Sequence, residues 1–363
     1  MNSRERVIAA LSHHEPDRTP VFEYVLLSPV ADQLLGRPYA ADPDGWDALA
    51  AEVGWEEAVR RNAVDRLELA LRLGHDLIYL WAPPLPRGAP PLPRGAPPLP
   101  RGAPPPPPVA DPVEALRRRN ERAAAAPPPG DQEMLVYALL KAEMARRGAD
   151  LPVLAPAYVH GVWTDVELMQ TMLLAPDVAR EHFQLATRRA LALVDRYAAL
   201  GLDLAGVGGD FAGTKLIISP QAYREFIVPE VRQVSRRAHA HGLYAINASD
   251  GDLWPVLDDF LYGCEVDGYL EIDMHAGMDL RRLKREHGAR ITFLGNLDCG
   301  ITLSFGSEEE VRQHTLDCLE AGRGNGGHVL CASNAIAASV PLRNYLAVVN
   351  AYREWCGLSA YRL

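Results

Sequence analysis

The chain has 363 residues, of which 48% are hydrophobic and 23% charged, and its formal net charge at pH 7 is -10. This apolar content excludes a chain that is disordered throughout, because it supplies enough nonpolar surface for a core. The negative charge argues against a nucleic-acid partner, since neutralising phosphates requires clustered Lys and Arg.

Nothing in the sequence predicts export or a membrane partner. Residues 1–17 are charged and helical in pattern, without the apolar run and cleavage site of a secretory signal. No stretch reaches the roughly 18 uninterrupted apolar residues that a membrane span needs. The five cysteines are widely spaced, with no C-x2-C pair, as expected for reduced thiols. We therefore expect a cytoplasmic protein.

Short β-rich runs alternate with helical patterns after the N-terminal helix. The runs predicted as strands are Pro20–Tyr24, Asp76–Leu80, Pro152–Ala157, Leu204–Val207, Tyr244–Asn247, Gly268–Leu270, Ile291–Leu294 and Val329–Cys331. A closed parallel barrel needs about eight such strand-helix alternations, whereas a doubly wound open sheet usually has about five or six strands. The sequence thus predicts an α/β fold, a (β/α)8 TIM barrel with an N-terminal helix, as a single domain over residues 1–363.

Three helix starts are indicated by local signals. The segments Thr164–Glu167 and Ser307–Glu310 have the S/T-x-x-E spacing of a capping box. Ser219 precedes Pro220, which is typical of an N-cap followed by proline at the first helical position. We expect helices to begin directly after these capping residues.

A proline-rich insertion occupies residues 83–108. Residues 83–103 are three tandem copies of Pro-Pro-Leu-Pro-Arg-Gly-Ala, and five prolines follow at Pro104–Pro108. Proline lacks the backbone donor and fixes φ, so we expect an exposed loop of mostly polyproline-II conformation. The R-x-x-P-x-x-P spacing of Arg87–Pro93 fits aromatic peptide-binding grooves, although a repeat expansion in a tolerant loop accounts for the same composition.

Polar side chains gather where the predicted strands end, and barrel enzymes do their chemistry at that end. The residues that follow the strands are Glu23, Tyr24, Trp81, Tyr158, His160, Asp210, Asp250, Asp252, Glu271, Asp273, Asn296, Asp298, Ser333 and Asn334. One such carboxylate alone is more often a helix cap. Several in one cavity raise each other's pKa and supply a general acid or base, or they hold a hard cation or a basic substrate.

Other catalytic motifs are missing or misplaced. The spacing of His239 and His241 resembles that of a metal-binding pair. They end a helix, however, and barrel helices end at the face opposite the site. We therefore interpret both histidines as structural. No G-x-G-x-x-G follows a strand, which disfavours a nucleotide cofactor. Neither a G-x-S-x-G elbow nor an H-E-x-x-H pair occurs, so serine hydrolase and zincin activities lack support.

Several segments resemble the uroporphyrinogen decarboxylase superfamily, which also contains cobalamin-linked methyltransferases. The similar segments are Arg4–Leu11, Glu15–Val21, Ile218–Phe226, Ala238–Gly242, Ser249–Asp252, Ala276–Leu280 and Gly295–Asp298. They are spread over most of the chain outside residues 83–150. The resemblance implies a (β/α)8 barrel, in agreement with the strand count.

The chain departs from both named branches of that superfamily. Decarboxylases open with an arginine-bearing segment that grips the carboxylates of the substrate, whereas Phe22–Ser28 here has no arginine, and an acidic mouth would repel uroporphyrinogen. Methyltransferases of the other branch hold zinc with a His-x-Cys and a later Cys, and the matching positions here are Ala248, Asp250 and Asn334. Because zinc at such sites prefers sulfur and nitrogen, no thiolate zinc and no metal ligand are predicted, and Cys331 is expected to be buried. The chain resembles a third group, with Ser-Asp-Gly after strand five.

The leading hypothesis is methyl-group transfer on a small substrate, with a corrinoid or tetrahydrofolate as methyl carrier and a corrinoid protein as partner. In this hypothesis the substrate is positioned and protonated by Asp250, Asp210 and Asn296. The substrate-binding residues are expected to be Glu23, Tyr24, Tyr158, His160, Asp273, Asp298 and Asn334.

Three alternatives stay open. A decarboxylase or lyase acting on a small acid would need a cationic anchor, for which Lys215 and Arg343 are the nearest candidates by sequence. A catalytically degenerate barrel serving as a binding subunit would explain the replaced zinc ligands. Asp250 itself could merely cap a helix beginning near Leu253.

Overall fold

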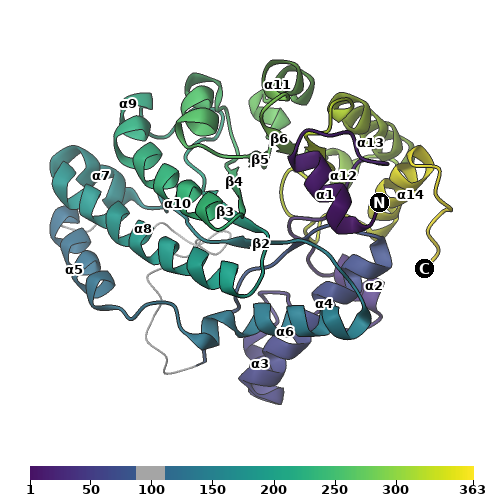
Figure 1. Cartoon of the computed structure of the whole chain (residues 1–363), viewed down its shortest axis with the longest axis horizontal. Coiled ribbons are helices and arrows are strands. Elements are labelled where there is room, and N and C mark those ends of the chain that lie inside the picture. The colour runs from purple at the N-terminus through teal and green to yellow at the C-terminus, as the bar shows by residue number, and fades with distance from the viewer. Residues whose placement is uncertain (87–110) are drawn as a thin grey trace.

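The computed structural model describes residues 1–86 and 111–363. Its seven strands form one parallel sheet in chain order: β1 Ile78–Tyr79, β2 Val153–Pro156, β3 Leu204–Gly208, β4 Tyr244–Ala248, β5 Gly268–Leu270, β6 Thr292–Leu294 and β7 His328–Val329. The sheet curls into a half-barrel with helices along its outside (Figure 1). The predicted α/β fold with consecutive parallel strands is therefore confirmed, while most of the predicted proline-rich insertion lies outside the described residues.

The first predicted strand, Pro20–Tyr24, does not form a regular strand. Val21 makes a single parallel bridge to Leu330. The Phe22 amide donates to the Leu330 carbonyl at 3.1 Å, and the Asp76 amide donates to the Val21 carbonyl at 2.7 Å. Pro20 has no amide to donate, which shortens the ladder. Residues 20–22 nevertheless contact the β7 side and the β1 side of the sheet at once.

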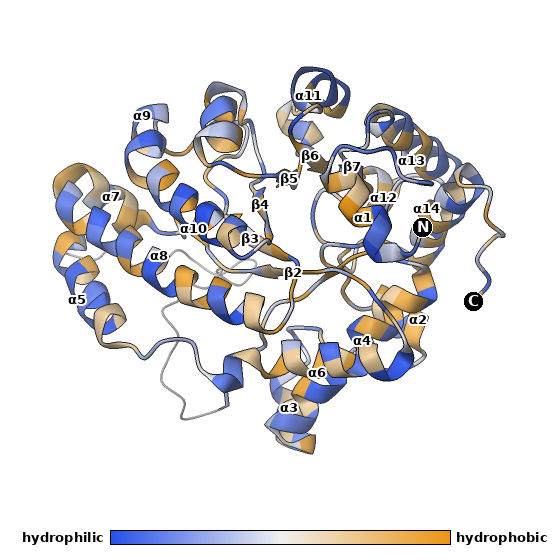
Figure 2. Ribbon diagram, in the orientation of Figure 1, coloured by the Kyte–Doolittle hydropathy of each residue, from blue (hydrophilic) through white to orange (hydrophobic). Residues whose placement is uncertain are grey.

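Amphipathic helices make up the outer layer. Among the described residues the α-helices are α1 Ser3–Leu11, α2 Val30–Leu35, α3 Trp46–Val53, α4 Trp55–Leu73, α5 Pro112–Ala125, α6 Asp131–Arg147, α7 Val166–Leu174, α8 Pro176–Ala199, α9 Pro220–Ala222, α10 Val228–Ala240, α11 Leu280–His287, α12 Thr302–Phe305, α13 Glu308–Gly322 and α14 Leu342–Trp355. Figure 2 shows hydrophilic and hydrophobic residues alternating along α8 and α10, as helices that cover a sheet require. In this part of the chain no helix has the length and hydropathy to cross a membrane.

Two of the three predicted helix starts are confirmed. Ser307 and Glu310 form the reciprocal capping box of α13, and the Ser219 side chain accepts the Ala222 amide at 3.1 Å where α9 begins. The prediction for Thr164 is wrong by one residue. Asp165 caps α7 by accepting the Leu168 amide at 2.8 Å, and an ion pair at 2.6 Å with Arg119 of α5 holds its carboxylate there.

The interior of the curled sheet is an apolar cluster closed at one end by α1. The side chains that point inward from the strands and adjoining segments are Phe22, Leu77, Leu154, Leu204, Ile246, Leu270, Leu294, Val329 and Cys331. Val7, Ala10 and Leu11 of α1 pack on them, and the Ala10 carbonyl accepts the Gly327 amide just before β7 at 2.8 Å. Helix α1 therefore covers the amino ends of the strands, so any cavity must open at their carboxyl ends.

A fully buried carboxylate fixes the N-terminal segment in this position. Asp76 accepts hydrogen bonds from Ser3 at 2.9 Å, Arg6 at 2.6 Å and Arg18 at 2.8 Å. The two guanidinium groups compensate the charge of a side chain that has no exposed surface. The segment before Val21 is thus held to the start of β1 by electrostatics as well as by packing.

Candidate active site

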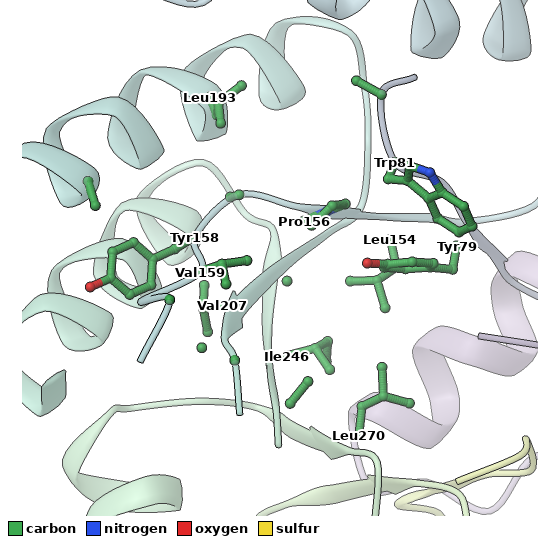
Figure 3. Close-up of a pocket in the computed structure, with 18 of the residues that line it drawn as sticks. Tyr79, Trp81, Leu154, Pro156, Tyr158, Val159, Leu193, Val207, Ile246 and Leu270 are labelled. Atoms are coloured by element: carbon green, nitrogen blue, oxygen red, sulfur yellow. The ribbon is translucent and has the colours of Figure 1, made fainter. Parts of the chain in front are cut away.

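A cavity of about 560 Å³ lies at the carboxyl ends of the first strands of the sheet. Figure 3 shows Tyr79 of β1, Leu154 and Pro156 of β2, Val207 of β3 and Ile246 of β4 around it. Its aromatic lining consists of Tyr24, Tyr79, Trp81, Tyr137, Tyr158, Trp163 and Tyr197. A ligand bound here would have an apolar, aromatic surround, which is typical of small-molecule sites.

Glycine at the end of β3 makes room for the cavity. Gly208 has a φ of 121°, and a Cβ there would lie 1.9 Å from the Asn247 amide oxygen. Only glycine tolerates both the backbone conformation and this contact. The turn brings Asp210, two residues later, to the cavity wall.

Three acidic side chains interact at the inner part of the cavity. Asp210 and Glu271 line the wall, and Asp210 accepts the Asp250 backbone amide at 2.9 Å. Burial, with repulsion from Asp210 and Asp273, raises the pKa of Asp250 to about 7. Burial likewise raises the pKa of Asp210. Several of the predicted carboxylates therefore lie together here, where burial and mutual repulsion favour their protonated forms.

Glu271 is the member of this group that the sequence hypothesis left out of its site. It follows β5 directly, is 7% exposed, and has a left-handed backbone φ of 72°. Burial, together with Asp210 and Asp250, raises its pKa well above the usual range, against the effect of a hydrogen bond with Tyr24. A strained, buried acid in a cavity wall is a mark of a functional site. Its place directly after a strand was the only signal in the sequence.

Asp250 does not cap the following turn. Its Oδ2 accepts the Asn334 side-chain amide at 2.6 Å, while the neighbouring Asp252 accepts the Trp254 amide at 3.1 Å. The side chain that bonds the backbone at this turn is thus Asp252 and not Asp250. Asp250 lies beside the cavity, joined to its wall through Asp210, but it is not among the lining residues.

Of the other predicted site residues, some line the cavity and others lie beside it. Tyr24 and Tyr158 line the cavity, although Figure 3 shows the Tyr158 hydroxyl turned away from the cavity centre. Buried His160 lies behind Gly209 of the wall, accepts the Val162 amide at 3.3 Å through Nδ1, and has its pKa lowered to about 4 by burial. Asp273 accepts the His275 amide at 2.9 Å, which places it in the turn after β5, close enough to act on Asp250.

Three other candidates are engaged away from the cavity wall. The side chain of Asn296 donates to the Ile272 carbonyl at 3.3 Å and accepts from the Cys318 thiol of α13 at 3.7 Å. Asp298 accepts the Ile301 and Thr302 amides just before and at the start of α12. Although burial opposes it, hydrogen bonds from His275 and these amides keep the pKa of Asp298 well below the usual range. Glu23 is buried beside Ala332, and burial raises its pKa to about 8. The structure therefore does not bring these three to the cavity wall.

The remaining charged candidates are also accounted for. His239 and His241 pair with Asp267 and Asp195, each at 2.8 Å, at the end of α10, so their structural interpretation is confirmed. Lys215 is exposed, as is Arg343 on α14, and neither lines the cavity. The one cation among the described lining residues is Arg189 of α8, which forms an ion pair with Glu133 of α6.

The positions that match the zinc ligands of related methyltransferases do not fit that metal. Asp250 and Asn334 bind each other, which supports the alignment of these two loops, and Ala248 has no ligating atom. In residues 1–86 and 111–363 no group of three or more His, Cys, Asp or Glu side chains is arranged to hold a metal ion. Cys331 is fully buried in the interior cluster, as expected.

A cavity with ionisable groups at the carboxyl ends of consecutive parallel strands is characteristic of TIM-barrel-like enzymes. The family model described as "Uroporphyrinogen decarboxylase (URO-D)" matches residues 152–355. The chain belongs to this family.

Known relatives are distant. Uroporphyrinogen decarboxylase of Coxiella burnetii (strain Dugway 5J108-111) is 23% identical over 186 residues, 50% of this chain and 48% of that protein, and the proteins of strains RSA 331 and RSA 493 match equally. The chain thus matches about half the length of these relatives. A solved structure of a methyltransferase from Methanosarcina mazei superposes with a TM-score of 0.66 at 20% identity, covering 98% of this chain and 99% of the other. That likeness shows a shared fold.

Proposed function

We propose that the protein transfers a methyl group from the oxygen of a small aromatic ether to a corrinoid or tetrahydrofolate carrier, the corrinoid being carried by a partner protein. The observation that carries this proposal is the group of three neighbouring, largely buried carboxyls, Asp210, Asp250 and Glu271, beside an aromatic cavity. As the methyl–oxygen bond breaks, the electron pair stays on the oxygen, which takes a proton from the cavity acids. The carrier forms the new bond to the methyl carbon.

The protonation state of the site favours an ether over a methylated ammonium. A quaternary nitrogen loses its positive charge as the methyl group leaves, so carboxylates would stabilise the bound substrate more than the transition state. An ether oxygen instead gains negative charge and requires an acid. An acid with a pKa near the working pH, such as Asp250 at about 7, is well suited to donate that proton.

Because the chain belongs to this family, decarboxylation of a small acid is the alternative function. A carboxylate substrate needs a cationic anchor, and the only described cation lining the cavity, Arg189, is engaged by Glu133. The acidic inner part would repel such a substrate. The whole-length likeness to a solved methyltransferase is a further reason to prefer methyl transfer.

The proposal includes a complete (β/α)8 barrel, in which residues 20–22 take the place of the first strand. Its support is the set of backbone hydrogen bonds from this segment to Asp76 on one side and Leu330 on the other. A closed barrel would give the cavity a rigid inner wall. Slow amide exchange at Phe22, comparable with that of β4, would support closure, and rapid exchange would contradict it.

The test is a methyl-transfer assay on the purified full chain. Methoxybenzenes with and without a ring hydroxyl are supplied with reduced cobalamin or with tetrahydrofolate, and both the released phenol and the methylated carrier are measured. Benzoic acids of the same size serve as matched substrates for carbon dioxide release. Formation of phenol and methylated carrier in equal amounts supports the proposal. Carbon dioxide release without methyl transfer would replace it with the decarboxylase alternative.

A further inference from the structure

We infer that Glu271, Tyr24 and Tyr79 form a proton relay that carries a proton from the buried carboxyl to the leaving oxygen of the substrate. The inference rests on the proposed ether cleavage and names the groups that would supply its proton. Of the three, only Tyr79 would touch the substrate and act as a catalytic residue. Tyr24 and Glu271 would act through it.

The three side chains converge from different parts of the fold onto one wall of the cavity. Tyr24 follows the Val21 bridge, Tyr79 belongs to β1 and Glu271 follows β5, and all three line the cavity. Burial, together with the nearby Tyr79 and Glu271, raises the pKa of the Tyr24 hydroxyl well above its ordinary value, and the rings of the two tyrosines are 4.5 Å apart between centroids. Figure 3 shows the Tyr79 hydroxyl pointing from β1 into the cavity. The two tyrosines and the carboxyl thus share one wall of the space where a ligand would bind.

Glu271 has the surroundings of a proton reservoir. Its neutral form is favoured because the side chain is buried and faces other acids. The titratable groups around it are Asp210 after β3, Asp250 after β4, Tyr269 of β5, Cys331 after β7, and the two relay tyrosines. No ion pair in residues 1–86 and 111–363 links Glu271 to a cation. Its left-handed backbone shows that the surrounding structure holds the carboxyl in place against a local preference.

The relay balances as a sequence of proton transfers. When the carrier takes the methyl carbon, the ether oxygen keeps the bonding electron pair and receives the hydroxyl proton of Tyr79. Tyr79 recovers a proton from Tyr24, and Tyr24 recovers one from Glu271, which ends as a carboxylate. Asp250 is partly exposed and electrostatically coupled to Glu271. It therefore offers the route by which a proton from water restores the starting state.

The first test asks whether Glu271 holds the proton and is bonded to Tyr24. Infrared spectra of the unliganded full chain at pH 7 should contain the carbonyl band of a protonated carboxylic acid. Glu271→Gln should remove this band and Tyr24→Phe should shift it, because the hydrogen bond is lost. Tyr262→Phe, a change of the same kind at a hydroxyl that is hydrogen-bonded to His287 away from the cavity, should leave it in place. A spectrum without a Glu271-dependent band, or without an effect of Tyr24→Phe, would overturn the relay.

The second test follows proton delivery to a ligand without any methyl transfer. 4-Nitrophenol is coloured only as its anion, so absorbance reports whether the bound probe is protonated. Wild-type protein should bind it as the neutral phenol, and Tyr79→Phe and Tyr24→Phe should each lower the protonated fraction by about 10-fold, the contribution of about one hydrogen bond, while Tyr262→Phe should not. If the wild type and all variants protonate bound 4-nitrophenol equally, or if the wild type does not bind it, the relay is contradicted. The proton for methyl transfer would then have to come from another donor. If these results hold but no methyl acceptor gives product, the relay stands and the proposed function fails.

Discussion

Replacing Asp250 by Asn tests whether burial and the neighbouring acids raise the pKa of Asp250 in the folded protein. Asn keeps the size of the side chain and can still accept the Asn334 amide, but it cannot ionise. The folded-state pKa of Asp250 is raised from 3.8 to about 7. Because the pKa of Asp250 is higher in the folded than in the unfolded state, its contribution to the free energy of unfolding is greatest below pH 3.8. This contribution falls as the pH rises from 3.8 to about 7. Above that range the wild type carries a repelled charge that the variant lacks.

The size of the effect follows from the pKa shift. About three units at 1.36 kcal/mol per unit give about 4 kcal/mol in total, less after the screening that a partly exposed side chain receives. About half of this falls between pH 5.5 and pH 8. With an unfolding entropy of about 2.1 cal/mol/K per residue, 2 kcal/mol corresponds to a melting-temperature difference of about 3 °C for 363 residues.

The assay is thermal and urea unfolding of the wild type and the variant at both pH values. Asp250→Asn should match the wild type more closely at pH 5.5 and be more stable at pH 8. Asp252→Asn is the matched control, because Asp252 is a neighbouring carboxylate that accepts the Trp254 amide outside the acid group. If the stability difference between Asp250→Asn and the wild type did not grow with pH, Asp250 would not be a repelled acid and the reasoning about this site would be refuted.

The other predictions concern turnover, neighbouring groups, the insertion and metal content. Asp250→Asn should lower methyl-transfer turnover per folded molecule by on the order of 100-fold, because it removes the acid through which Glu271 regains its proton. Asn334→Ala removes the hydrogen bond that lowers the pKa of Asp250, so the pH at which activity is half lost should rise. Glu23→Gln should leave the free energy of unfolding nearly unchanged below the ordinary pKa of 4.5 and raise it increasingly as the pH rises to about 8, as denaturation at about pH 4 and about pH 9 would show. Deleting residues 83–103, most of which lie outside the described residues, should change the melting temperature little, because loop-closure cost varies only logarithmically with length. Elemental analysis should find no stoichiometric zinc, and bound zinc with cysteine ligands would overturn the alignment of Asp250 and Asn334.

The strand order could be predicted because the sequence pattern is local. Each of β1 to β7 overlaps a β-rich run bounded by turn residues, and parallel strands joined by helices leave few possible orders. The failure at Pro20–Tyr24 has a physical cause. An apolar run indicates burial, but the length of a ladder depends on which backbone groups face each other, and Pro20 has no amide to offer.

The composition of the site was harder to predict than its location. The sequence places Asn296 and Glu271 alike, each shortly after a strand. Which of them reaches the cavity depends on packing, because Asn296 is drawn to the Cys318 thiol of α13, whereas Glu271 is held in the wall by Tyr24 and an unusual backbone conformation. The positions of Asn296 and Glu271 depend on contacts with residues distant in sequence. The spacing of residues along one strand does not predict such contacts.

The contacts of residues 20–22 have a consequence for how the protein is made. Leu330, one of the two backbone partners of this segment, is synthesised about 300 residues after it. Until then residues 20–22 lack their partner on the β7 side, and unpaired strand edges favour aggregation. Pairing of this segment with the β7 side is therefore a late event of synthesis. Chains that stop before Leu330 should need chaperones to remain in solution, even though they contain most of the cavity.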